Sequence, residues 1–329
     1  MESKCARGVS VVFEDLVTVI VPLYNCKNIL TKNLDSILGQ TYKNCEYIFI
    51  DDCSKETYNE LIPSFENIRL IRNKRNIGVG ETRNVGLSVA KGEYIVFFDG
   101  DDIPQVSFVE KCLKKMQESN ADMVVCNFAE NDYKPRHNFL HDTKQLNSSA
   151  NIVFDDDLKG SVWNKMFRRS IIENFGIRFA DTSVANEDIC FTYSYLPFCH
   201  KVAFINEVLY IYNTELNLIT RRKFEDISSL DIFLNSCFFL DKLGKQYKIN
   251  YGSLLKILCY KFSKLGIRNL IDNEDKRQAC LNHILNNTKF IKLCNSIIKY
   301  TTNYKEAERY CVAVCNNDTQ AMSELLWKK

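Results

Sequence analysis

The sequence predicts an α/β domain with a mostly parallel sheet, followed by an all-helical region. Between residues 17 and about 130, short apolar runs of strand length alternate with helix-like segments, which is the pattern of βαβ units. From residue 223 onward the chain shows helical periodicity, with no proline and with glycine only at 244, 252 and 266. A hydrophobic content of 46% and a charged content of 26% are ordinary for a globular protein.

The expected elements follow one another in a regular order. Apolar runs predict strands at 17–22, 45–51, 67–72, 93–98 and 122–128. Periodic segments between them predict helices at 27–39, 55–64, 79–91 and 105–119, on both faces of the sheet. Residues 131–160 are polar and aperiodic, and we interpret them as a surface insertion near the open edge of the sheet. Beyond them we expect helices near 168–175 and 187–197 and a strand pair at about 201–213.

Composition excludes several classes of site. The 14 cysteines contain no CxxC pair, which argues against a zinc ribbon and favours reduced core thiols in a cytosolic protein. The four histidines have no ligand-like spacing. We see no signal peptide, and no apolar run approaches the roughly 18–20 residues that cross a bilayer.

Charge is distributed unevenly along the chain. Residues 1–220 hold 24 Lys and Arg against 30 Asp and Glu, a net charge of −6, whereas residues 221–329 hold 19 against 11, a net charge of +8. The segment 254–270 combines lysines with an apolar stripe. One interpretation is a helical bundle with solvated lysines; the other is peripheral contact of 223–329 with the inner face of the cytoplasmic membrane.

The most informative segment is Asp99-Gly100-Asp101-Asp102, which directly follows the apolar run 94–98. Clustered carboxylates at the end of a buried strand are costly unless a cation binds there. A divalent metal that also holds a phosphate would satisfy them. The alternative is a turn whose aspartates cap the next helix.

Two other strands end in residues that suit a nucleotide. One strand ends at Pro22-Leu23-Tyr24-Asn25, and another ends at Asp51-Asp52. Ligands of parallel α/β sheets lie outside the carboxyl ends of the strands. The three strand ends together therefore predict a nucleotide–metal site. The run Gly78-Val79-Gly80 lacks the third glycine of a dinucleotide fingerprint, where Arg83 stands instead, so we expect it only to open a helix.

These segments together resemble the family 2 glycosyltransferases, inverting enzymes with the GT-A fold, and most closely those that build bacterial capsule, lipooligosaccharide and other surface glycans. The resemblance covers roughly residues 16–215 and does not extend to the helical C-terminal third. It implies a catalytic domain (16–222, with a nucleotide-binding half 16–130 and an acceptor half 131–222). The sequence pattern itself predicts a leader (1–15) and a helical region (223–329). The motifs that carry the resemblance are Pro22-Leu23-Tyr24-Asn25, Asp51-Asp52-Cys53-Ser54, Arg83-Asn84, Asp99-Gly100-Asp101-Asp102, Trp163-Asn164-Lys165 and Glu187-Asp188.

The resemblance implies a role for each donor-site residue. Tyr24 would stack on uracil, and Asp99 would hold the ribose. Asp52, with Asp51 beside it, would accept the base N–H, the alternative being an Asx-turn after the strand. Asp101 would bind Mn²⁺ or Mg²⁺, and Asp102 would support the metal or cap a helix. Arg83 would orient the nucleotide, the alternative being a solvated helix arginine. The remaining residues expected at the donor are Pro22, Asn25 and Gly100.

The acceptor side is implied by two further motifs. Asp188 would be the general base on the acceptor hydroxyl, in preference to Glu187; the alternative is acidic residues favoured by a helix dipole. Trp163-Asn164-Lys165 would form a sugar platform, with Lys165 near a phosphate or the acceptor, unless Trp163 is a core aromatic.

Two departures from the family pattern are visible. Cys53 stands where the family usually has glycine. Asn213 and residues 217–219 stand where the family often has an arginine followed by a serine, and Arg221 and Arg222 are the candidate substitutes for binding diphosphate.

The sequence therefore predicts a cytoplasmic, metal-dependent, inverting hexosyl- or N-acetylhexosaminyltransferase. Its partners would be a nucleotide sugar, expected to be UDP-linked, and a glycan or lipid-linked glycan acceptor, with no nucleic acid. One alternative is a sugar nucleotidyltransferase, but that class needs a glycine-rich basic loop after the first strand, which Pro22-Leu23-Tyr24-Asn25 is not. The other is a non-catalytic nucleotide-binding scaffold of a polysaccharide assembly complex.

Overall fold

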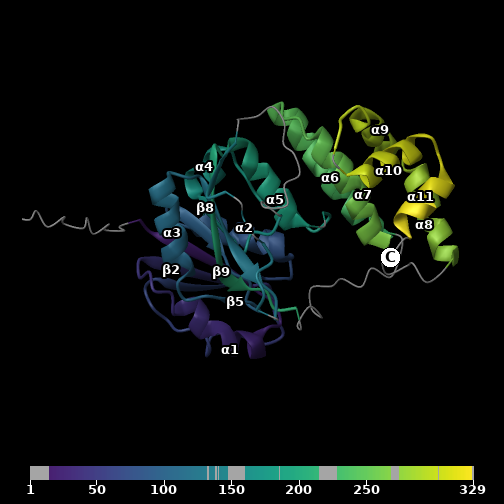
Figure 1. Ribbon diagram of the computed structural model, residues 1–329. Helices are drawn as coiled ribbons and strands as arrows, with labels where there is room; N and C mark the ends of the chain where they lie inside the picture. The colour runs from purple at the N-terminus through teal and green to yellow at the C-terminus, as the bar shows by residue number, and fades with distance from the viewer. Residues whose placement is uncertain are drawn as a thin grey trace, which may run out of the picture.

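A computed structural model describes residues 15–131, 133–137, 139, 141–146, 160–184, 186–214, 228–267, 274–302 and 304–327 of the chain. It shows an α/β domain and a separate group of helices that packs beside it (Figure 1). The α/β domain contains β1 (Val17–Leu23), α1 (Lys27–Leu38), β2 (Cys45–Asp51), β3 (Ile68–Arg72), α2 (Val79–Val89), β4 (Tyr94–Phe97), β5 (Ile103–Pro104), α3 (Phe108–Ser119), β6 (Met123–Ala129), β7 (Thr143–Gln145), β8 (Lys165–Arg168), α4 (Arg169–Asn174), α5 (Glu187–Tyr195), a short 3₁₀ helix (Leu196–Phe198) and β9 (Lys201–Ile211).

The strands form one mixed sheet in the order β3-β2-β1-β4-β8-β6-β9-β5, and β7 pairs with β9. The pairs β1–β2, β1–β4, β2–β3 and β6–β9 are parallel. β8 runs antiparallel to both β4 and β6. The expected parallel sheet is therefore confirmed for the nucleotide-binding half, whereas the second half is mixed.

The sheet buries apolar side chains on both faces, as the unbroken burial of β1 and β2 indicates. One face carries Ile20, Ile48 and Phe97 under α2, α4 and α5. The other carries Val19, Val21 and Phe49 under α1 and α3. Helices on both faces of the sheet are thus confirmed.

Two expected elements are wrong. The predicted helix at 55–64 is a series of turns, because Tyr58 is buried as a loop anchor whose hydroxyl accepts a hydrogen bond from the Cys26 N–H at 3.0 Å, and Pro63 disfavours helix before it. The predicted strand pair at 201–213 is the single strand β9. Exposed Asn206 and Glu207 lie where the register with β6 shifts, so the polar pair marks an irregularity within one strand rather than a turn between two.

The C-terminal helices form a bundle against α5 (Figure 1). The hydroxyl of Tyr251 donates to the Tyr193 carbonyl at 2.7 Å, and the Asn235 amide donates to the Ser183 carbonyl at 2.9 Å. The helices are α6 (Ser228–Tyr247), α7 (Gly252–Ile267), α8 (Glu274–Asn286), α9 (Thr288–Ile297), α10 (Lys305–Cys315) and α11 (Thr319–Leu326).

The apolar stripe of the segment 254–270 is not a membrane-facing surface. In α7, Leu254, Leu258 and Phe262 are buried in the bundle. Lys256 is buried too, and its ammonium donates to the Ile298 carbonyl at 2.8 Å. The stripe therefore packs in a helical bundle, although Lys256 is not one of the solvated lysines that this interpretation expected, and residues 268–270 lie outside the described part. No helix within the described part has the length and hydropathy to span a bilayer.

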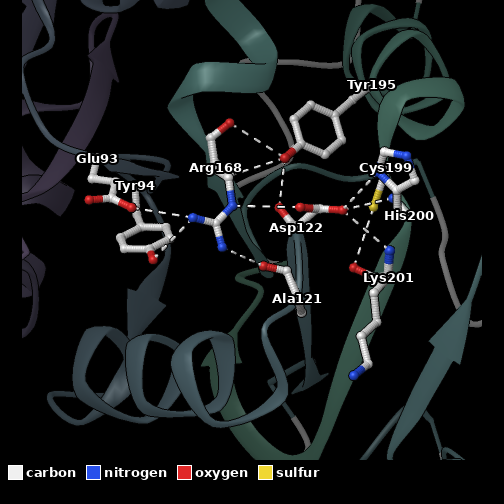
Figure 2. A network of polar contacts seen from close by, with 9 residues as sticks. All are labelled: Glu93, Tyr94, Ala121, Asp122, Arg168, Tyr195, Cys199, His200 and Lys201. Carbon is white, nitrogen blue, oxygen red and sulfur yellow. Dashed lines mark hydrogen bonds and ion pairs between the residues drawn. The ribbon is translucent and has the colours of Figure 1, made fainter.

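The amino edge of the sheet is stabilised by paired charges. Asp122, just before β6, accepts hydrogen bonds from the backbone N–H of His200 at 2.7 Å and of Lys201 at 3.4 Å, and lies 3.6 Å from the Arg168 guanidinium (Figure 2). Tyr195 donates to the Asp122 carbonyl at 2.6 Å. Asp122 is thus held by protein partners and has a structural role at the amino edge of the sheet.

Candidate functional site

The candidate site lies at the carboxyl edge shared by β1, β2 and β4. Tyr24 follows β1 and is 42% exposed, as a ring that stacks on a ligand must be. Asn25 joins the first two strand ends: its N–H donates to Ser54 Oγ and its Oδ1 accepts from the Lys55 N–H, both at 2.9 Å. The loop after Pro22 and Leu23 is thereby fixed relative to the loop after β2.

The acidic pair after β2 is buried and accepts several hydrogen bonds. Asp51 accepts from the Ser54 N–H at 2.9 Å and forms an ion pair with Arg72. Asp52 accepts from the Asn73 amide and the Ile77 N–H at 2.9 Å, and from the Gly78 N–H at 2.8 Å. A carboxylate has about four acceptor positions, so Asp52 retains one for a base N–H. The role of Asp52 in base recognition stays a prediction. Its hydrogen bonds also fix the loop before α2, which the sequence did not predict.

Cys53 adopts a left-handed backbone conformation, with φ of +60°. Glycine adopts this conformation without steric cost, whereas a side chain costs roughly 1 kcal/mol. The departure from the family's usual glycine therefore places strain in the loop that carries Asp51 and Asp52.

Replacing Cys53 by glycine is expected to stabilise the protein by up to about 1 kcal/mol, partly offset by the greater freedom of glycine in the unfolded chain. The check is urea unfolding of the purified variant. Cys53→Ala is the matched control, because it removes the thiol and keeps the strained Cβ. A stability of Cys53→Gly below that of Cys53→Ala would contradict the strain.

The segment after β4 places its three carboxylates differently. Asp99 pairs with Arg83 at 2.7 Å and stays partly exposed. Asp102 is 1% exposed; it accepts from the Asn213 N–H at 2.8 Å, and its other oxygen has no hydrogen bond within the described ranges. α3 begins after Ser107, so the alternative of Asp102 as a helix cap is wrong. A Cβ on Gly100 would lie 2.7 Å from the Leu23 side chain, so a larger residue would require that side chain to move.

Asp101 is compensated only in part, because its surroundings raise its pKa more than a backbone hydrogen bond and the charge of Arg83 lower it. No ion pair within the described ranges involves it. Burial, followed by the negative charge of Asp99, raises its pKa from 3.8 to about 6. Burial and the charges of Asp99 and Asp101 also raise the pKa of Asp102 well above its ordinary value. A cation bound here would relieve this repulsion.

Arg83 connects the two halves of the site. It is buried one turn into α2, and its guanidinium contacts Asp99 at 2.7 Å and Glu187 at 3.1 Å. The guanidinium lies over the Phe179 ring at 5.4 Å, and its Nε has no hydrogen bond in the described part of the chain. Arg83 therefore faces the site, and the alternative of a solvated arginine is wrong. As expected, Gly78 and Gly80 lie at the start of α2.

Asp188 lies in the first turn of α5, next to Glu187, which pairs with Arg83. Burial, and then the charge of Glu187, raise its pKa from 3.8 to about 7, while Arg83 acts in the opposite direction. Its Oδ1 accepts from the Ile189 N–H at 2.7 Å. A carboxylate with a pKa near neutrality is suited to accept a proton at physiological pH.

The expected sugar platform is not formed by Trp163-Asn164-Lys165. Trp163 is buried and stacks on Tyr210 and Tyr212, with ring centroids 4.8 Å and 5.3 Å away. Asn164 donates to the Cys126 carbonyl, and Lys165 is fully buried with its ammonium on the Ser161 carbonyl at 2.6 Å. The motif connects β8 to β6, and the core interpretation of Trp163 is correct.

Two residues that organise the site were missed. Tyr210 is buried in β9, and its hydroxyl accepts from the Asp99 N–H at 3.1 Å. Asn213 supports the loop through its bonds to Asp102 and to the Asp101 carbonyl, the latter at 3.2 Å. The sequence marks Asn213 only as a departure from the family pattern, and the supporting role of each residue has no signal there because it acts across more than 100 residues. Arg221, Arg222 and residues 217–219 lie outside the described residues.

Comparison with known proteins agrees with this geometry. Residues 18–176 match the model of Glycosyl transferase family 2. The chain is 27% identical to Glycosyltransferase GlyG of Streptococcus pneumoniae serotype 4 over 286 residues, which cover 81% of this chain and 94% of GlyG. Residues 18–176 therefore match a family 2 glycosyltransferase domain, and the similarities support a glycosyltransferase role for the chain.

Solved structures support the GT-A fold. The structure of S. aureus TarS 1–349 in complex with UDP aligns with a TM-score of 0.67 at 16% identity, covering 94% of this chain and 90% of TarS. TarS 1–349 in complex with UDP-GlcNAc gives 0.62. Mannosyltransferase PcManGT from Pyrobaculum calidifontis in complex with GDP-Man and Mn²⁺ gives 0.51 at 17% identity, covering 95% and 88%.

Proposed function

We propose that the protein transfers a hexosyl or N-acetylhexosaminyl group from a UDP-sugar to a hydroxyl of a glycan or lipid-linked glycan, with inversion, in the synthesis of a bacterial surface polysaccharide. The observation that carries the proposal is the arrangement around Arg83. This one buried cation links Asp99, on the donor side, to Glu187, beside the candidate base Asp188. The residues proposed to bind the donor and those proposed to act on the acceptor are therefore adjacent at this edge of the sheet.

The residues present fit a divalent metal. Asp101 offers a carboxylate without an ion pair in the described residues, and Asp102 has a buried oxygen without a hydrogen-bond partner there. Within the same residues no group of three Asp, Glu, His or Cys side chains could hold an ion alone. Mg²⁺ and Mn²⁺ suit such a site, because they bind one or two carboxylates together with phosphate oxygens and water. When bound, the ion would neutralise the charge that develops on the leaving diphosphate.

Inversion requires only one catalytic carboxylate on this chain. Asp188 would take the proton of the acceptor hydroxyl as that oxygen forms its bond to the sugar C1. The bond from C1 to the diphosphate breaks on the opposite face, and UDP leaves with the bonding electrons. Arg83 would hold Asp99 and Glu187 in place. Because no covalent intermediate forms, a second carboxylate nucleophile is unnecessary.

The preference for a uridine donor rests on Tyr24 and on the neighbouring structures. The exposed Tyr24 ring can stack on a base, and the remaining acceptor position of Asp52 suits a base N–H. TarS binds UDP and UDP-GlcNAc in its solved complexes, whereas PcManGT binds GDP-Man. UDP-GlcNAc and UDP-glucose are the first donors to examine.

A thermal-shift panel of UDP- and GDP-sugars with Mn²⁺ is expected to identify the donor. A ligand at about 100 times its Kd stabilises the folded state by about 2.7 kcal/mol, so the correct donor should raise the unfolding temperature measurably. Turnover with that donor should release UDP. Release of pyrophosphate instead would indicate a nucleotidyltransferase. Binding without turnover on any acceptor would favour the non-catalytic scaffold.

A further inference from the structure

One exposed aromatic residue lies in a backbone conformation that its side chain disfavours. Tyr133 is 66% exposed and has a φ of +57°. A bulky side chain at positive φ is an outlier that persists only where the surrounding structure imposes it. Among the described residues, the Tyr133 ring belongs neither to the two hydrophobic clusters nor to the donor site described above.

The turn that carries Tyr133 is held on both sides. The Tyr133 N–H donates to the Glu130 carbonyl at 2.8 Å, and the Glu130 carboxylate pairs with Arg136 at 3.0 Å. Ala129 and Pro135 form an antiparallel bridge, and the Arg136 N–H donates to the Phe128 carbonyl at 2.9 Å. The ring is thus presented to solvent by a turn fixed to the end of β6.

This turn belongs to the same edge as the candidate site. β8 is antiparallel to both β4 and β6, so β4 and β6 end at the same edge of the sheet. The Thr214 N–H donates to the Asn131 side chain at 3.2 Å, and the neighbouring Asn213 binds Asp102. Tyr133 is two residues from Asn131, a span of at most about 7 Å.

We propose that Tyr133 is an acceptor-binding residue whose ring stacks on the C–H face of a pyranose ring of the acceptor glycan. This inference rests on the proposed function and specifies its acceptor as a sugar ring. A tyrosine ring provides a large, rigid, amphipathic contact area with little loss of side-chain entropy. Trp163, which the sequence suggested for this task, is buried.

The test compares four variants of the full chain with the unmodified protein. Tyr133→Phe keeps the ring, Tyr133→Ala removes it, and Tyr133→Gly removes it and also relieves the positive φ. Phe65→Ala is the matched control: Phe65 is 65% exposed and lies before β3, at the opposite edge of the sheet. UDP release is measured with the p-nitrophenyl β-glycosides of glucose, galactose and N-acetylglucosamine as acceptor probes.

The expected result is a rise of about 10-fold in the acceptor KM for Tyr133→Ala and Tyr133→Gly, the size of one lost stacking contact. Tyr133→Phe and Phe65→Ala should keep the acceptor KM, and all four should keep the donor KM. If Tyr133→Ala transfers sugar with an unchanged acceptor KM, the role of Tyr133 is refuted and the proposed function still stands. Absence of UDP release from the unmodified protein with every donor and probe would overturn the proposed function, and the inference with it.

Discussion

Replacing Asp101 by asparagine is expected to reduce sugar transfer by about 10³-fold or more while leaving the fold intact. A bound metal contributes several kcal/mol of stabilisation to the developing charge, and each 1.36 kcal/mol corresponds to a factor of 10 in rate. Asparagine removes the anionic charge and keeps the shape. Because Asp101 forms no ion pair within the described residues, its loss removes no salt bridge that stabilises the fold.

The measurement is UDP release as a function of Mn²⁺ concentration, together with the unfolding temperature. Asp122→Asn is the control, because Asp122 lies at the opposite edge and is held by His200 and Arg168 (Figure 2). That variant should lose stability and keep the metal dependence. Full transfer by the unmodified protein in excess EDTA would refute a metal at Asp101.

The nucleotide-binding half of the fold could be predicted because its signals are local. β1, β2 and β4 are mostly apolar and fully buried, and each is followed by polar residues that a parallel sheet brings to one edge. Register and strand order there follow from short right-handed crossovers. This is why Tyr24, Asp52 and Asp101 could be placed together from the sequence alone.

The acceptor half could not be predicted with the same detail, because its partners are distant in sequence. Lys165 resembles a surface cation in the sequence, yet it is buried against Ser161 and Asn164. Tyr133 carries no motif, and its exposure depends on a turn fixed by Glu130 and Arg136. In the helical region, the lysine and leucine pattern of α7 fits both a membrane-facing helix and a bundle core, and only the packing distinguishes them.

Replacing Asp188 by asparagine is expected to lower turnover by about 10²–10⁴-fold, the usual contribution of a general base, while donor binding persists. The base must be deprotonated to accept the acceptor proton. With a pKa of about 7, the fraction of active enzyme should rise about tenfold per pH unit below pH 7 and level off above it. The variant should lose this acid limb.

Glu187→Gln separates the two members of the acidic pair. The charge of Glu187 is the second largest cause of the raised pKa of Asp188, so removing it should move the acid limb of the pH profile to lower pH. Arg83 would lose one of its two ion-pair partners, so the donor KM should rise. Initial rates of UDP release between pH 5 and 9 test both variants at saturating donor. If Glu187→Gln is inactive and Asp188→Asn is active, the general base is Glu187. If the pH profile of Asp188→Asn is identical to that of the unmodified protein, Asp188 is not the group whose titration limits the rate.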